Sequence, residues 1–253
     1  VAQVRARGAQ TPPQVVLDDG EQVKPDLVIL ADGGRSPLTE SLGFVAQKRP
    51  FDRTAVLGRV HISRPILGRA YERFVGTGPL ALLPLSGGLY GFVWSLAPSV
   101  ATALANDRQA LVAHLHDAMD PALGEVSLAT EPVLIPLVER WIDQPYRPGV
   151  LVLGNGAQTI HPVAGQGMNL ALRGVSRLID SLDDGPVDLS VQQAFADWRL
   201  DRDRTRFASS ALEALFDVPT LWRRVGTAVG MSVFDQSRVL KRRLAMAGMG
   251  LLS

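Results

Sequence analysis

The chain has 253 residues, enough for one large domain or two modest ones. Hydrophobic residues make up 46 %, which favours a folded protein with a real core over a disordered chain. The net charge of +1 argues against a surface built for nucleic acid, and the absence of cysteine excludes disulfides, thiol catalysis and thiolate metal sites.

Two further site classes are not expected. His114 and His116 stand two residues apart on a predicted helix and therefore point to different faces, so no metal site is predicted. No apolar run approaches the roughly 18 residues that cross a bilayer.

The first 31 residues are predicted to be β structure. An Asp19-Gly20 turn separates two strands, and the second strand ends in the continuous apolar run 27–31. Such a run is typical of a strand covered on both faces. It leads directly into Asp32-Gly33-Gly34, which by itself is better explained as an ordinary turn than as a functional site.

From about residue 44 the pattern changes to short apolar runs separated by Gly or Pro, which predicts an antiparallel sheet. Residues 100–120 interrupt it with helical spacing that places Leu104, Leu111 and Leu115 on one side. We place this insert at 44–146.

Residues 149–173 carry the strongest chemical signal. The apolar run 150–153 meets a glycine-rich loop, and a helix begins near Gly167. Glycine lets the backbone approach a ligand, and a helix N-terminus adds partial positive charge, so the segment predicts a cofactor site. It is not a Rossmann fingerprint, because Thr159 stands where the third glycine would fall. The helix carries apolar side chains at i, i+3, i+4 spacing: Leu172, Val175, Leu178, Ile179 and Leu182.

Three other features follow, and two of them leave alternatives open. His161 suits acid–base chemistry, but a structural role that holds the loop by a hydrogen bond is the favoured interpretation. Residues 189–216 predict a long helix rich in Arg and Asp. The stretch 220–253 is apolar and basic, which fits either a membrane or partner contact or packing on its own domain.

Two motifs together resemble a known family. ADGGRS at 31–36, and LGNGAQTIHPVAGQGMNLALR at 153–173, resemble the second and third motifs of the class A flavin aromatic hydroxylases. The resemblance implies an α/β (α+β) chain with the p-hydroxybenzoate hydroxylase fold. Asn155, Gln158 and YERFVGTGPLALLPL at 71–85 are similar to the branch that hydroxylates polyprenyl phenols in ubiquinone biosynthesis.

The resemblance implies a partial FAD-binding domain at 1–43 and 147–188, a substrate-binding sheet at 44–146 and a helical region at 189–253. It implies an FAD-dependent monooxygenase that uses NAD(P)H as reductant. Its substrate would be a polyprenylated phenol, and it would be cytoplasmic. Peripheral contact with the inner membrane face or a multi-enzyme complex through 220–253 stays open.

The resemblance also implies roles for individual residues. Asn155 would hydrogen-bond the ribityl chain, Pro162 would line the cavity beside the isoalloxazine, and Asp32 and Gly33 would lie by the pyrophosphate. Backbone N–H groups of the third motif would face the flavin N1–C2=O edge. The full predicted set is Asp32, Gly33, Gly154, Asn155, Gly165, Gln166, Gly167, Met168 and Asn169 for the cofactor, with Pro162 and His161 for catalysis.

The GxGxxG segment and the acidic ribose anchor with which that family begins do not occur in this sequence. We therefore expect an N-terminally truncated form that is inactive alone and binds FAD weakly or not at all. Two alternatives remain. One is a flavin hydroxylase or reductase of the same fold that acts on a soluble aromatic compound. The other, suggested by Asn155 in place of the usual aspartate, is a non-catalytic scaffold subunit with a degenerate cofactor fold.

Overall fold

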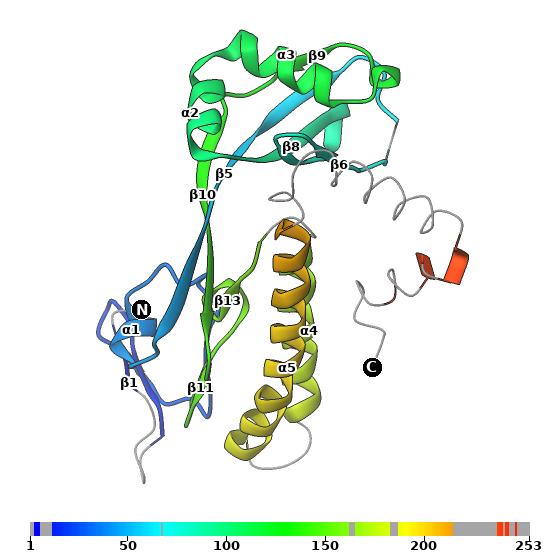
Figure 1. The fold of residues 1–253 in the computed structure, drawn as a ribbon. Coiled ribbons are helices and arrows are strands. Elements are labelled where there is room, and N and C mark those ends of the chain that lie inside the picture. The colour runs from blue at the N-terminus through cyan, green and yellow to red at the C-terminus, as the bar shows by residue number, and fades with distance from the viewer. Residues whose placement is uncertain are drawn as a thin grey trace. The chain divides into compact units, whose positions relative to one another are not determined.

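The structure, a computed structural model, describes residues 3–5, 12–66, 68–161, 165–182, 187–214, 237–239, 241–242 and 246 (Figure 1). The chain forms two compact units, which are considered separately. The first unit comprises 1–49 and 138–253, and the second comprises 50–137. The chain passes from one unit to the other within β5 (Ala46–Ile62) and returns within β10 (Val133–Ile142).

The first unit contains two small three-stranded sheets. One is antiparallel, in the order β1 (Gln3–Arg5), β2 (Gln14–Val16), β3 (Gln22–Val23). The other has the order β11 (Tyr146–Arg147), β12 (Val150–Val152), β4 (Val28–Leu30), with β4 parallel to β12. The remaining elements of this unit are α1 (Leu38–Ser41), η3 (Gly154–Gly156), β13 (Gln158–Thr159), α4 (Gln166–Leu182) and α5 (Val187–Ala214).

Helices α4 and α5 lie side by side (Figure 1), and their buried side chains share one hydrophobic core with β12. Their close approach depends on Gly174, where an added Cβ would lie 3.3 Å from both Leu153 Cδ1 and Trp198 Nε1. The helix predicted after the glycine loop is thus present, but of its predicted apolar face only Leu178 is buried. The buried positions of α4 are Leu170, Gly174, Leu178 and Ser181, whereas Leu172, Val175, Ile179 and Leu182 are exposed.

The exposed face of α4 has a physical reason. The sheet and α5 select the side that carries Gly174 and Ser181, because small residues let the helix axes approach. Apolar spacing alone identifies an amphipathic helix but not which neighbour its face meets.

Charged side chains are buried where α5 meets β10. Glu139, only 1 % exposed, pairs with Arg206 (Oε1–Nε 2.8 Å) and Arg49 (Oε2–Nε 3.1 Å). The Arg206 guanidinium also stacks on Trp141, 3.6 Å from the ring centroid. Arg202 is equally buried and donates to the carbonyl oxygen of Ile142 at 2.6 Å.

The second unit is an antiparallel sheet covered on one face by helices. Its strands run β5–β8–β7–β6, and β9 pairs with β5. Val56, Leu80 and Trp94 are buried on the covered face with Leu104 and Leu111 of the helices. The elements are β6 (Tyr71–Val75), β7 (Gly78–Pro84), η1 (Ser86–Gly88), β8 (Leu89–Leu96), α2 (Pro98–Asn106), α3 (Arg108–Ala118), η2 (Pro121–Leu123) and β9 (Val126–Leu128).

The helical segment predicted at 100–120 is two helices. Asp107 adopts an extended conformation between α2 and α3, and its carboxylate accepts from the Ala110 N–H at 2.9 Å. Aspartate at an N-cap satisfies an otherwise unpaired N–H group of the helix that follows. Asp107 therefore marks both the end of α2 and the start of α3.

Most of 220–253, the predicted membrane or partner contact, lies outside the described residues. None of the described helices combines the length and the apolar character that crossing a bilayer requires. The unit limits of 50–137 differ from the predicted insert at 44–146 by a few residues at each end, and the assignment of that insert to substrate stays a prediction.

Replacing Glu139 by Gln should destabilise the first unit by about 3 kcal/mol, because it leaves two arginines without their buried carboxylate. The matched control is Glu131→Gln, which removes an exposed ion pair with Arg108 and should cost less than about 1 kcal/mol. Urea denaturation of both variants checks this. Equal losses of stability would contradict the account of the buried pair.

Candidate functional site

Two glycine loops leave the same edge of the parallel strand pair. Val28 pairs with Val150 and Leu30 with Val152, and the Leu153 N–H extends the ladder to the Leu30 carbonyl at 2.9 Å. The loops that follow are Asp32-Gly33-Gly34 and Gly154-Asn155-Gly156. The carboxyl ends of adjacent parallel strands are the usual ligand-binding edge of an α/β sheet. Segments 120 residues apart therefore meet where a ligand is expected.

The two loops are in direct contact. A Cβ added to Gly34 would lie 3.2 Å from Gly156 Cα, and one added to Gly156 would lie 3.4 Å from the Gly34 nitrogen. Arg140, from β10, stabilises the contact because its guanidinium donates to the Gly156 carbonyl oxygen. The same guanidinium would lie 2.6 Å from a Cβ added to Gly34. Side chains larger than hydrogen at either glycine would push the loops apart.

Asp32 organises its own loop. Its carboxylate accepts hydrogen bonds from the Gly34 N–H at 2.8 Å, the Ser36 N–H at 3.3 Å and the Ser36 hydroxyl. The Ser36 hydroxyl, aided by the two N–H groups, lowers the pKa of Asp32 below its ordinary value, although burial acts in the opposite direction. Asp32 is therefore a charged turn-former, and it leaves the Gly33 backbone on the open side of the loop.

The second loop separates an exposed residue from buried ones. Asn155 is exposed, while Gln158 and His161 are 3 % and 1 % exposed. Gln158 is fixed by β13, which pairs with β10. Burial makes His161 part of the loop's support, and Pro162 lies outside the described residues.

The first turn of α4 supplies further donors next to η3. Helix α4 packs against η3, and Gly165 precedes it with a φ of 59°. The first N–H groups of a helix have no acceptor within the helix, and a helix N-terminus of this kind favours electron-rich groups. Of the predicted residues in this turn, Gln166, Gly167 and Asn169 are half-buried, and Met168 is 71 % exposed.

These glycines leave room for an extended ligand. At Gly33, Gly154, Gly165 and Gly167 an added Cβ would meet nothing within 4 Å. Three of the four have positive φ, so backbone rather than side chain faces the space. The arrangement suits a large electron-rich group bound by backbone N–H donors, which is the character of a flavin nucleotide.

A family comparison agrees with this geometry. Residues 4–183, which include both glycine loops, match the family model described as FAD binding domain. The chain belongs to the FAD binding domain family. The p-hydroxybenzoate hydroxylase-like fold expected from the motifs is confirmed, because solved structures of FAD-dependent aromatic hydroxylases share it.

Curated relatives come from ubiquinone biosynthesis. The chain is 32 % identical to the 3-demethoxyubiquinol 3-hydroxylase of Escherichia coli over 67 % of its length and 43 % of the relative. It is 33 % identical to ubiquinone hydroxylase UbiL of Rhodospirillum rubrum, over 66 % of this chain and 39 % of that relative. The mouse ubiquinone biosynthesis monooxygenase COQ6 is 27 % identical over 75 % of this chain and 48 % of the mouse protein. The chain spans less than half the length of these relatives.

Solved structures show the same fold at lower identity. PqsL, a probable FAD-dependent monooxygenase from Pseudomonas aeruginosa, has a TM-score of 0.71 at 24 % identity, covering 88 % of this chain and 65 % of PqsL. HpxO of Klebsiella pneumoniae, as the R204Q variant complexed with FAD, has a TM-score of 0.66 at 20 % identity, covering 99 % of this chain and 68 % of HpxO.

Arg140 was not predicted as a site residue. It stands beside Glu139 in the otherwise apolar run 133–142. Two adjacent charged residues in such a strand were the one sequence feature that could have pointed to a structural role for them. The role of Arg140 depends on β10 passing next to η3, which only the tertiary structure shows.

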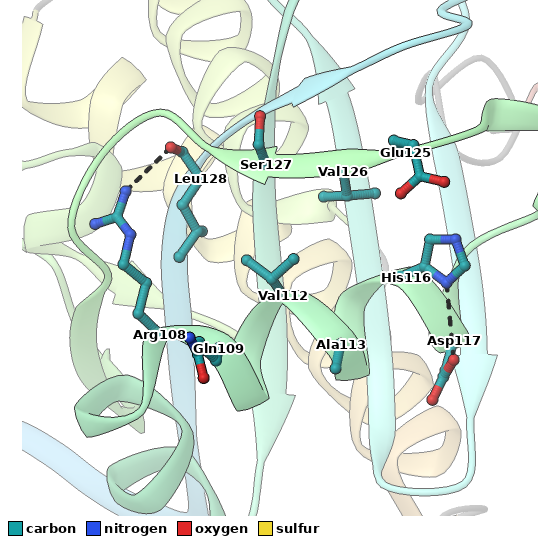
Figure 2. Close-up of a pocket in the computed structure, with 10 residues that line it drawn as sticks. All are labelled: Arg108, Gln109, Val112, Ala113, His116, Asp117, Glu125, Val126, Ser127 and Leu128. Atoms are coloured by element: carbon teal, nitrogen blue, oxygen red, sulfur yellow. Dashed lines mark hydrogen bonds and ion pairs between the residues drawn. The ribbon is translucent and has the colours of Figure 1, made fainter.

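The second unit has a hollow of its own. About 620 Å³ lies between α3 and β9, where Arg108 donates to the Leu128 carbonyl and His116 faces Asp117 at 3.8 Å (Figure 2). None of the predicted cofactor residues lines it. Size alone therefore does not identify the functional site.

Substitutions at two neighbouring glycines distinguish the cost of backbone strain from the cost of breaking the contact between the loops. Gly33 and Gly34 both have positive φ (74° and 71°), but only Gly34 touches the second loop. Gly33→Ala should cost about 1–2 kcal/mol from left-handed strain. Gly34→Ala should cost a further 1–2 kcal/mol or so, because it displaces Arg140 from the Gly156 carbonyl.

Urea denaturation of the two variants measures the difference. A further variant, Gly20→Ala, places the same strain in the remote Asp19-Gly20 turn, where φ is 87° and no atom lies within 4 Å of the added Cβ. Gly33→Ala should match it. Equal stability of Gly33→Ala and Gly34→Ala would contradict the contact between the loops.

Proposed function

We propose that the protein is an FAD-dependent monooxygenase that hydroxylates a polyprenylated phenol ring in ubiquinone biosynthesis, with NAD(P)H as reductant. The contact between the two glycine loops, at the shared edge of β4 and β12, carries the proposal. The names of the curated relatives supply the substrate class.

The proposed cofactor contacts follow the loops. Gly33, in the loop that Asp32 braces, would lie beside the pyrophosphate, and Asn155 would hydrogen-bond the ribityl chain. N–H groups of Gly167, Met168 and Asn169 would face the isoalloxazine and favour negative charge there. Bound FAD would supply the redox chemistry that activates O2, and these residues would bind and orient it.

Two other predicted residues would shape the surroundings of the cofactor. Pro162 would line the cavity beside the ring system, and His161, being buried, would hold the loop rather than exchange protons with substrate. Asn155 differs from the aspartate common in such loops because an amide both donates and accepts and carries no charge. It can therefore hydrogen-bond a ribityl hydroxyl in either sense.

The proposed setting is the cytoplasm. A polyprenylated substrate resides in the membrane, so peripheral contact or association with other enzymes through the apolar, basic stretch 220–253 would bring the enzyme to it.

Product analysis tests the proposal. The full gene product, supplied with FAD and NAD(P)H, should convert a prenylated phenol to its hydroxylated product and should prefer it at least tenfold over a soluble aromatic acid. Preference for the soluble compound would instead assign another hydroxylase of the same fold. Purified full gene product that binds no flavin would contradict the proposal and favour a scaffold subunit.

A further inference from the structure

Within the described part of the chain, one edge of β9 has no neighbouring strand. On its other edge the Glu125 carbonyl accepts from the Ser63 N–H at 3.0 Å, and the Ala129 N–H donates to β5 at 2.8 Å. In an antiparallel pair such bonded residues recur at every second position, and the residues between them turn their N–H and C=O groups to the opposite side. The main-chain groups of Val126 and Leu128 therefore point away from β5.

A contact with Arg108 agrees with this direction. The Arg108 guanidinium, from α3, donates to the Leu128 carbonyl at 3.1 Å. The Leu128 N–H and both main-chain groups of Val126 form no hydrogen bond with any residue that the structure describes. Unpaired groups at the edge of a sheet can pair with an extended segment of another chain. Strand β9 is thus a template for an added strand.

This free edge borders the hollow between α3 and β9 (Figure 2). The hollow has a volume of about 620 Å³, within the roughly 300–1,000 Å³ of known ligand pockets. Val112 and Ala113 of α3 line one side, and Val126 and Leu128 of β9 line the other. Because α3 flanks the edge, the space suits a single extended segment and not the sheet of a second copy, which would bring its own helices against α3.

The hollow is negatively charged at one end. Glu125 and Asp117 lie there together with His116, whose Nδ1 is 3.8 Å from the Asp117 carboxylate (Figure 2). At the opposite end the charge of Arg108 is balanced by its ion pair with Glu131. With histidine neutral, the two carboxylates at the first end favour a lysine or arginine side chain of the bound segment.

We propose that β9 and α3 bind an extended segment of a partner protein, which adds to β9 as a strand and places a basic side chain beside Glu125 and Asp117. The inference does not depend on the proposed function. Main-chain hydrogen bonds to Val126 and Leu128 supply affinity that is independent of the partner's sequence. Alternate side chains of the segment face α3 at Ala113, and the carboxylates select a basic segment.

Fluorescence anisotropy with dye-labelled peptides and the full gene product tests the proposal. The probes are Lys-Val-Thr-Val-Thr and its reversed sequence, because a strand of either direction can bond to the free groups of β9. At least one probe should bind with a Kd below about 1 mM. The N-methylated form of that probe, which has no main-chain donors, should bind at least about tenfold more weakly.

Two variants and their matched controls locate the binding site. Ala113→Phe, on the exposed side of α3, fills the hollow and should weaken binding at least about tenfold, whereas Ala103→Phe on the exposed side of α2 should bind as wild type does. Glu125→Lys should weaken binding by about tenfold, and Glu21→Lys, an exposed change in the first unit, should not. All four should melt near the wild-type temperature, because the positions are exposed.

Hydrogen exchange distinguishes an added strand from attraction between charges alone. The bound probe should slow exchange of the Val126 and Leu128 N–H groups and leave β6, at the opposite edge of the same sheet, unchanged. The proposal is wrong if neither probe binds, if binding survives Ala113→Phe, or if Val126 and Leu128 stay unprotected. Self-association of the full gene product that Ala113→Phe abolishes would assign this edge to a second copy and overturn the assignment to a partner.

Discussion

The parallel pairing of β4 with β12 is the constraint on which the proposed site depends. Each strand has only three residues, yet their register brings both glycine loops to the same edge. A slip by one residue would turn the buried side chains of β12 to the other face and move one loop by about 3.3 Å. The backbone contact between Gly34 and Gly156 would then be lost.

The surrounding elements hold this pairing in register. Val150, Leu151 and Val152 are completely buried, and Gly174 lets α4 approach Leu153 and Trp198. Arg140 links β10 to the second loop, while the ion pair between Glu139 and Arg206 links the same strand to α5. One strand thus links the packing of the helices to the geometry of the glycine loops.

Local patterns predicted most elements but not their partners. The strand before Asp32, the glycine loop and the helix after it follow from residue order, because turn residues and periodicity act over short distances. That the two loops serve one cofactor was implied only by the family resemblance, and the pairing of β4 with β12 was not predicted. The buried face of α4 and the break at Asp107 were missed, since neighbouring α5 and a side-chain cap decide them. The role of Arg140 follows only from β10 and the second loop meeting in the folded chain.

Hydrogen exchange on the full gene product, with and without FAD, tests the central claim most directly. If the loops form one cofactor site, FAD should slow exchange together at Gly33–Gly34, at 154–157 and at the start of α4, while the N–H groups in the remote Asp19-Gly20 turn remain unchanged. Protection of one loop without the other, or protection confined to other parts of the chain, would contradict it.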